Sequence, residues 1–251
     1  MIKAYQEDQI QIIELNRPKV NAINEELINS LDAQLENLKK DDTIKGVILT
    51  GQEGIFSAGL DIIALYNTDK EYMKFFWSIF SNLLIKIYSY PKIMFTAISG
   101  HSPAGGTVLS IMTDYRIMSQ GNYLIGLNEV AVGLSMPIGI GRVFQSLLGE
   151  RIAEKMTLKG QLIDPENAKK IGLVDDVVKS EELLSRSVST LNDWLMLPFQ
   201  KQIQSKLSLR KEVIDLMKSS AEKDNNEVIN AWFSDECRET MGRIVNKLSK
   251  K

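Results

Sequence analysis

Short apolar runs alternate with longer amphipathic segments over the first half of the chain. Such runs, each typical of a buried strand, cover residues 10–15, 45–51, 92–100 and 114–119. Residues 25–40 instead repeat leucine at helical spacing, at positions 27, 31, 35 and 38. Residues 70–88 have the same periodicity. Strands that alternate with helices predict a sheet of parallel strands joined by right-handed crossovers.

The pattern changes from about residue 137 onward, where helical segments dominate and only residues 172–178 look extended. Beyond about residue 198, apolar positions are scattered among many charges, which favours a helical face that packs on another subunit. We therefore expect an α/β core over residues 1–195 and a C-terminal helical region over residues 196–251.

Composition narrows the class of protein. The chain has 251 residues, 44% of them hydrophobic, which is enough for one sizeable core. Lys and Arg total 30 against 32 Asp and Glu, so charge gives no case for nucleic acid or an anionic membrane. One Cys and one His exclude an internal disulfide and a Cys cluster, and a His-based metal site is not expected.

The sequence also predicts the cellular compartment of the protein. No apolar run reaches about 18 residues, so no membrane-spanning helix is expected. The first residues lead directly into a strand, with neither a secretory nor a transit pattern. We expect a cytoplasmic protein, with a mitochondrial or peroxisomal matrix as the alternative for a processed eukaryotic form.

Two glycine-containing turns offer main-chain hydrogen-bond donors. In GIFSAGLDI (54–62) a strand enters a tight Ala-Gly turn, which would leave the Leu60 N–H free near a helix start. In PAGGTVLS (103–110) Gly105 and Gly106 lie where a helix begins, and helix N-termini have unsatisfied N–H groups and a partial positive charge. Each turn alone is equally well explained by close packing. Together, one N–H from each could stabilise an oxygen that gains negative charge during a reaction.

Glu129 is a candidate general base. It lies in YLIGLNEVAVGL (123–134), where most neighbours are apolar. Burial disfavours a charged carboxylate and raises its pKa, and a base works best when its pKa is near the operating pH. The alternative is a surface glutamate on a loop.

Taken together, these segments resemble the crotonase superfamily, the enoyl-CoA hydratase/isomerase fold. The motifs occur in the family's order over roughly residues 8–178: LNRPKVNAIN, GVILTG, FSAGLDI, AISGHSPAGG, DYRIMS, GLNEVAVGL and AKKIGLVDDVV. The resemblance implies an α/β core of spiralling ββα units with a C-terminal helical trimerisation region at 196–251. It also implies a homotrimer or dimer of trimers, a coenzyme A thioester as ligand, and no separate cofactor or metal.

The resemblance also implies roles for individual residues. The N–H groups of Leu60 and Gly105 would hold the thioester oxygen opposite Glu129. The implied substrate-binding residues are Ser57, Ala58, Gly59 and Asp61 around the acyl-CoA, and Lys19, Val20 and Asn21 near its adenine and pantetheine. Where many relatives have a basic residue near the adenine, this chain has Ile63. The candidates for the coenzyme phosphates are therefore Lys19, Lys247, Lys250 and Lys251.

The residue at position 108 distinguishes the two main activities that the resemblance allows, hydration and isomerisation. Hydratases of the superfamily use two glutamates. One lies where this chain has Glu129, and the other lies three residues after the position of Gly105, where this chain has Val108. With Glu129 as the single acid, the resemblance implies a Δ3,Δ2-enoyl-CoA isomerase of fatty-acid β-oxidation, which moves a proton from C2 to C4. The alternatives are other crotonase chemistry, such as hydration, and a non-catalytic acyl-CoA-binding relative.

Overall fold

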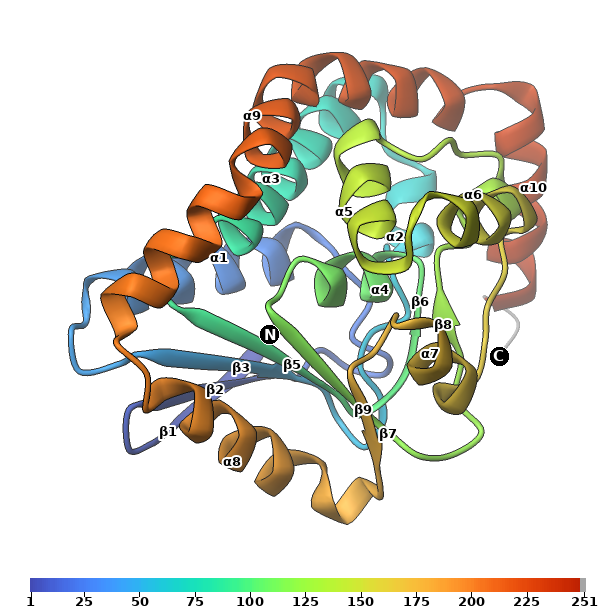
Figure 1. The fold of residues 1–251 in the computed structure, drawn as a ribbon. Coiled ribbons are helices and arrows are strands. Elements are labelled where there is room, and N and C mark those ends of the chain that lie inside the picture. Colours follow the sequence, from blue (N-terminus) through green and yellow to red (C-terminus); the bar gives the residue numbers. More distant parts are fainter. Residues whose placement is uncertain (249–251) are drawn as a thin grey trace.

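The computed structural model describes residues 1–248 and is built on a 6-stranded sheet in the order β1-β2-β3-β5-β7-β9 (Figure 1). The strands are β1 Ile2–Glu7, β2 Ile10–Leu15, β3 Gly46–Thr50, β5 Ile93–Ile98, β7 Tyr115–Ser119 and β9 Asp176–Val178. Every neighbouring pair is parallel except β1–β2, which is an antiparallel hairpin. The α/β class and the parallel pairing predicted from the apolar runs are confirmed.

Both faces of this sheet are covered, which explains why its inner strands are apolar throughout. Alternate side chains of β3 and β5 point to opposite faces: Ile48 and Phe95 pack against α8 (Leu183–Leu195), whereas Leu49 and Met94 join the larger core. Figure 1 shows α8 below the sheet, α7 (Pro165–Ile171) beside its β9 edge, and the other long helices above it.

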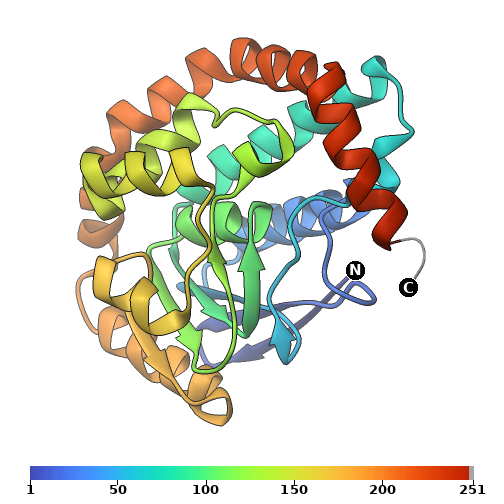
Figure 2. The ribbon, with the colours of Figure 1, turned by 90° about the vertical axis from the view of Figure 1, so that its right-hand side faces the viewer.

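A second, 3-stranded sheet carries the loops that contain Leu60, Gly105 and Glu129 (Figure 2). It consists of β4 Gly54–Ile55, β6 Gly100–Pro103 and β8 Ile125–Gly126, all parallel. Three times in succession the chain passes from a strand of the large sheet to a strand of the small sheet and then into a helix or helical turn. The successions are β3-β4-α2 (Ile62–Tyr66), β5-β6-α4 (Gly105–Ile111) and β7-β8-η1 (Glu129–Val132). The ends of the three small strands therefore come together.

The helices follow the predicted ranges closely in the first half of the chain. They are α1 Glu25–Lys40, α2 Ile62–Tyr66, α3 Lys70–Tyr88, α4 Gly105–Ile111, α5 Ile138–Leu148, α6 Glu150–Lys159, α7 Pro165–Ile171, α9 Phe199–Trp232 and α10 Asp235–Leu248, with the short 3₁₀ turns η1 Glu129–Val132 and η2 Ser180–Glu182. In α1 the side chain of Asn24 caps the first turn, and the four predicted leucines are buried.

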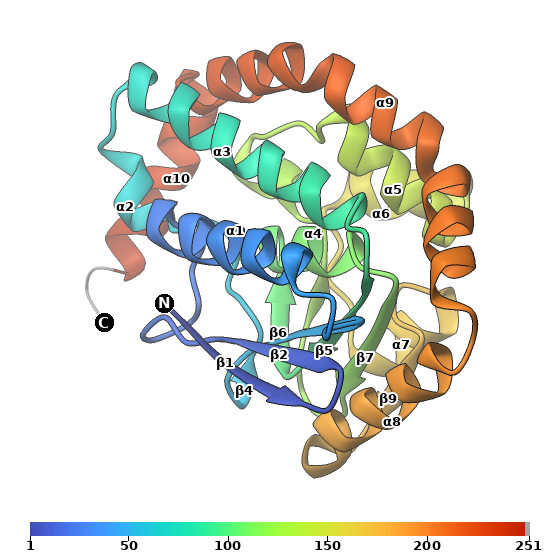
Figure 3. The same cartoon turned by 90° about the vertical axis from the view of Figure 1, so that its left-hand side faces the viewer.

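The C-terminal helices pack on the rest of this chain. α9 runs along α3 and α5, and α10 packs against α2 (Figure 3). The trimerisation role expected for residues 196–251 stays a prediction. No helix among residues 1–248 has the length and apolar character that crossing a membrane requires.

One buried carboxylate fastens α9 to the core. Asp114, which follows α4, accepts a hydrogen bond from Lys206 Nζ at 2.8 Å and forms an ion pair with Arg210, whose Nη2 is 2.9 Å from Asp114 Oδ1. It also accepts from the backbone N–H of Met94 at 2.7 Å. All three side chains of this ionic cluster are largely withdrawn from solvent, so each charge depends on its partners.

Candidate active site

A cavity of about 690 Å³ lies where the loops of the small sheet face α3 and the C-terminal helices. It is solvent-exposed at Lys19 and Val20 and closed at its other end by buried side chains such as Phe80 and Trp232. Seven sequence-predicted residues line it: Lys19, Val20, Ala58, Leu60, Asp61, Gly105 and Glu129. Three others, Ser57, Gly59 and Asn21, lie beneath its surface.

Two main-chain amides, of Leu60 and Gly105, lie close together in the wall of the cavity. Ile23 N–H donates to Gly59 O at 2.8 Å, and Asp61 N–H donates to Ile23 O at 2.9 Å. Because these two groups face Ile23, the N–H of Leu60 between them points to the opposite side, toward Gly105. No acceptor among residues 1–248 takes up the N–H of Leu60 or that of Gly105.

The distance between these two loops explains the paired glycines. A Cβ added to Gly105 would lie 3.3 Å from Leu60 N and 3.0 Å from Ile23 Cδ1. A Cβ on Gly106 would lie 2.6 Å from Ser57 O, closer than real contacts allow. The glycines therefore permit close packing, and this packing brings two N–H donors together; their role in stabilising an oxygen stays a prediction.

Ala104 makes the turn that aims the second amide. It has φ 47° and ψ −118°, a conformation that non-glycine residues rarely adopt, immediately before α4. Its own N–H donates to Gly126 O at 2.9 Å, which fixes the turn to β8. Unfavourable backbone conformations held by surrounding contacts are concentrated at functional sites.

Ser57 and Asn21 support the first amide rather than line the cavity. Both are fully buried. Ser57 Oγ donates to Asn21 O at 2.7 Å and accepts from Gly59 N–H at 3.2 Å. The Asn21 side chain in turn donates to Phe56 O at 3.0 Å and accepts from Arg17 N–H at 2.8 Å. The tight turn before Leu60 is thus held by side-chain hydrogen bonds.

An ion pair that the sequence analysis did not anticipate lies beside Leu60. Arg17 Nη2 is 2.5 Å from Asp61 Oδ2, and both residues line the cavity. Asp61 Oδ1 also accepts from Ala64 N–H at 3.0 Å and so caps α2. The carboxylate of Asp61 is therefore committed to protein partners. The sequence offers one hint of this ion pair, because Arg17 lies in the same NRPK loop as Lys19.

Glu129 differs from Asp61 in having no such partner. It begins η1 and lines the cavity, and its Oε2 is buried without a hydrogen-bond partner in the described residues. Burial raises the pKa of Glu129 to about 7. The neighbouring Asn128 also lines the cavity, with a buried Oδ1 that likewise has no partner there. A carboxyl group of this kind can exchange a proton near neutral pH.

The closed end of the cavity is apolar. Val108, from α4, is 3% exposed and lies in the wall, so no acid occupies that position. Further apolar wall residues come from α3, the segment 132–140 and the two last helices: Trp77, Phe80, Val132, Leu134, Pro137, Ile140, Val228, Trp232, Met241 and Ile244. The contribution of α9 and α10 was not predicted, because their apolar positions indicated a subunit contact.

The charged groups near the open end are few. Lys19 is exposed and lines the cavity, whereas Lys247 is exposed on α10 and does not. The candidates Lys250 and Lys251 lie outside the described residues. Among the residues that are described, no group of three or more His, Cys, Asp or Glu side chains could hold a metal ion.

Comparisons with known proteins agree with the fold. A family model described as enoyl-CoA hydratase/isomerase matches residues 5–250. The mitochondrial enoyl-CoA delta isomerase 1 of Mus musculus is 32% identical over 244 residues, 96% of this chain and 84% of that protein. The short-chain-enoyl-CoA hydratase of Clostridium acetobutylicum is 28% identical over 188 residues, 74% of this chain and 72% of that protein. The structure of human mitochondrial delta3-delta2-enoyl-CoA isomerase superimposes with a TM-score of 0.96 at 26% identity, covering 99% of this chain and 98% of that one.

Proposed function

Because the chain belongs to the enoyl-CoA hydratase/isomerase family and has the crotonase fold, we propose that it is a Δ3,Δ2-enoyl-CoA isomerase. It would convert a 3-enoyl-CoA into trans-2-enoyl-CoA during fatty-acid β-oxidation. The observation that carries this proposal is one carboxyl oxygen of Glu129 and two N–H donors, none of which has a hydrogen-bond partner among residues 1–248, in one largely apolar cavity.

The proposed reaction uses Glu129 twice. Ionised Glu129 removes a proton from C2 of the 3-enoyl thioester, and the electrons move into a dienolate whose oxygen accepts hydrogen bonds from Leu60 and Gly105. The protonated carboxyl then delivers a proton to C4, and the C3–C4 double bond becomes a C2–C3 double bond. No atom is gained or lost, so the reaction needs no co-reactant and no cofactor beyond the coenzyme A of the substrate. Each N–H donor of such a site is worth about 2.7–4 kcal/mol of barrier.

Hydration is the second candidate because hydratases are among the relatives. Adding water across a 2-enoyl thioester requires a water molecule that is held and activated while a proton reaches C2. The side chain of Val108 offers no hydrogen bond to such a water, and Asp61 is engaged with Arg17. Isomerisation makes no demand on a second acid, which is why we favour it.

The direct test supplies trans-3-hexenoyl-CoA and trans-2-hexenoyl-CoA separately to the purified protein. Isomerase activity requires a conjugated 2-enoyl thioester to form from the first. Hydratase activity would instead consume the second and produce 3-hydroxyacyl-CoA. The isomerase proposal fails if only the second substrate reacts.

A non-catalytic acyl-CoA-binding protein is distinguished by Glu129→Gln. The isomerase should lose several orders of magnitude in kcat with this variant while acyl-CoA affinity changes little, since glutamine keeps the shape of the side chain. Glu222→Gln, which alters an exposed glutamate on α9, is the matched control and should retain full activity. Turnover that survives Glu129→Gln would remove the residue from the mechanism.

A homotrimer or dimer of trimers remains part of the proposal, with residues 196–251 supplying contacts between subunits. Sedimentation of the purified chain would test this assembly, and a monomer at micromolar concentration would contradict it.

A further inference from the structure

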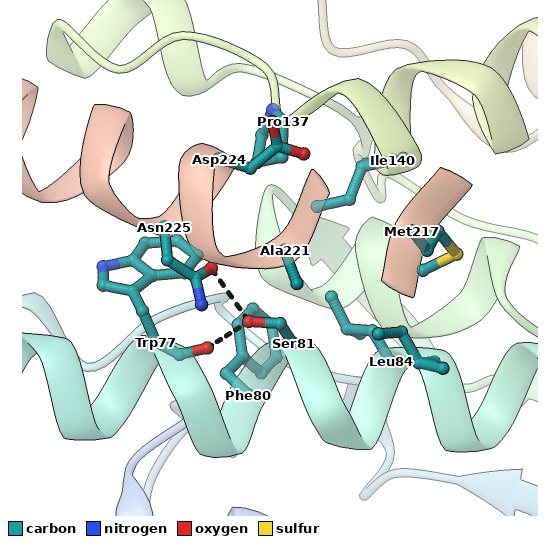
Figure 4. A pocket seen from close by; sticks show the side chains of 12 residues that line it. Trp77, Phe80, Ser81, Leu84, Pro137, Ile140, Met217, Ala221, Asp224 and Asn225 are labelled. Carbon is teal, nitrogen blue, oxygen red and sulfur yellow. Dashed lines mark hydrogen bonds between the residues drawn. The ribbon is translucent and has the colours of Figure 1, made fainter. Parts of the chain in front are cut away.

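The closed end of the active-site cavity is a thin wall with a second cavity behind it. This second cavity has a volume of about 40 Å³ and lies between α3, α5 and α9 (Figure 4). Four residues line both cavities: Trp77, Phe80, Pro137 and Ile140. A residue that contacts both spaces separates them, so the wall is one side chain thick at these positions.

Phe80 is the most firmly held part of this wall. It is 2% exposed, and its ring stacks on Phe76 at 6.1 Å between centroids. The indole of Trp77 contacts the same ring edge-on at 5.8 Å. Neighbours on two sides fix the orientation of the ring, so it presents a defined apolar surface to the cavity. Ile140, from α5, is 6% exposed and completes the wall from the other side.

The small cavity is apolar where it meets the wall and polar at its rim. Leu84 and Met217 are buried in it and do not line the active-site cavity. At the rim, Ser81 Oγ donates to Asn225 Oδ1 at 2.8 Å (Figure 4). Asp224, also at the rim, accepts from Ile138 N–H at 3.2 Å. An alkyl chain that entered this space would gain apolar contacts and stop before the polar rim.

We propose that Phe80 and Ile140 set the longest acyl chain that the site accepts, and that the small cavity is a latent extension of the acyl site. The substrate class is then a 3-enoyl-CoA whose chain ends at this wall. This inference rests on the proposed function for the identity of the ligand, but the wall acts on any acyl-CoA.

The test measures binding, so that it does not depend on turnover. Saturated acyl-CoAs from hexanoyl to tetradecanoyl are titrated calorimetrically into the full-length protein. Each buried methylene contributes roughly a fourfold gain in affinity. For the wild type we expect this gain to continue up to one chain length and then to stop.

Phe80→Ala should move this break point to longer chains. The first acyl-CoA beyond the wild-type limit should bind about fifteenfold more tightly to the variant, from roughly two additional buried methylenes. Ile140→Ala opens the same wall from α5 and should give the same shift, which keeps the test valid if Phe80→Ala does not fold. Leu84→Ala is the matched control: it enlarges the small cavity but leaves the wall, so its profile should match that of the wild type.

Three results would overturn the inference: a wild-type affinity that rises without a break, a break point unchanged in both Phe80→Ala and Ile140→Ala, or an equal shift in Leu84→Ala. Turnover of 3-enoyl-CoAs is measured in parallel. If the break point moves as expected while no 3-enoyl-CoA is isomerised, the wall is confirmed and the proposed function alone fails.

Discussion

Ionised Glu129 should lower the free energy of unfolding, and replacing it with a neutral residue should remove this effect. Burial raises the pKa of Glu129 from its ordinary value of 4.5 to about 7. In the unfolded chain the same carboxyl group is solvated and titrates near its ordinary value. Because a tenfold change in proton affinity corresponds to about 1.36 kcal/mol, the ionised form of Glu129 lowers the free energy of unfolding by about 3 kcal/mol.

This cost depends on pH in a defined direction. Below pH 4.5 the carboxyl group is protonated in both states and the cost is absent. Between pH 4.5 and about 7 the unfolded chain loses the proton first, so stability falls as pH rises. Above about pH 7 the full cost is present. Glu129→Gln, which is neutral throughout, should therefore be about 3 kcal/mol more stable than the wild type at pH 8. This corresponds to a Tm higher by about 6–12 °C for a chain of this size.

The assay is thermal unfolding followed by circular dichroism at several pH values from 5 to 8, with protein concentration fixed because assembly also affects Tm. The difference between Glu129→Gln and wild type should shrink steadily toward pH 5. Glu222→Gln, on an exposed surface of α9, should follow the wild type at every pH. A Tm for Glu129→Gln equal to or below that of the wild type at pH 8, or a difference that does not change with pH, would refute the reasoning.

Three further predictions follow from the described contacts. The kcat/KM for 3-hexenoyl-CoA should rise about tenfold per pH unit below pH 7 and level off above it, as ionised Glu129 accumulates; a flat profile from pH 5 to 8 would contradict this. Gly106→Ala should lower both Tm and kcat because the new Cβ collides with backbone, whereas Gly141→Ala, in an open helical position, should leave activity intact and stabilise by up to about 1 kcal/mol. Asp114→Asn should reduce the free energy of unfolding by about 3–5 kcal/mol in denaturant titrations, since two buried cations lose their counter-charge; a loss below 1 kcal/mol would show that they find other partners.

The sequence predicted the elements whose burial pattern is simple. The inner strands are covered on both faces, so their apolar runs stand out, and α1 has one buried stripe with a capping asparagine. The two-residue strands of the small sheet were harder to predict. β4 and β8 are too short to create a period, and β6 continues directly from β5 after one residue.

The candidate site was predictable where it depends on backbone and not where it depends on tertiary packing. Leu60 and Gly105 lie in glycine turns that are visible in the sequence, and Glu129 is a charge among apolar neighbours. The pair between Arg17 and Asp61 joins residues 44 positions apart, which no local pattern reveals. Trp232 is fully buried in the cavity wall, yet most of α9 before residue 228 is polar or charged, which hides the role of its last turn.

The groups of the proposed mechanism and part of the cavity wall come from different ends of the chain. The proposed base and both proposed amide donors lie before residue 130, while Val228, Trp232, Met241 and Ile244 come from the last two helices. During synthesis on a ribosome, the groups of the proposed mechanism therefore emerge well before the side chains that cover them. A nascent or clipped chain that ends before α9 would contain all three of these groups but lack that part of the wall, so under the proposed mechanism we expect turnover only once the final helices have docked.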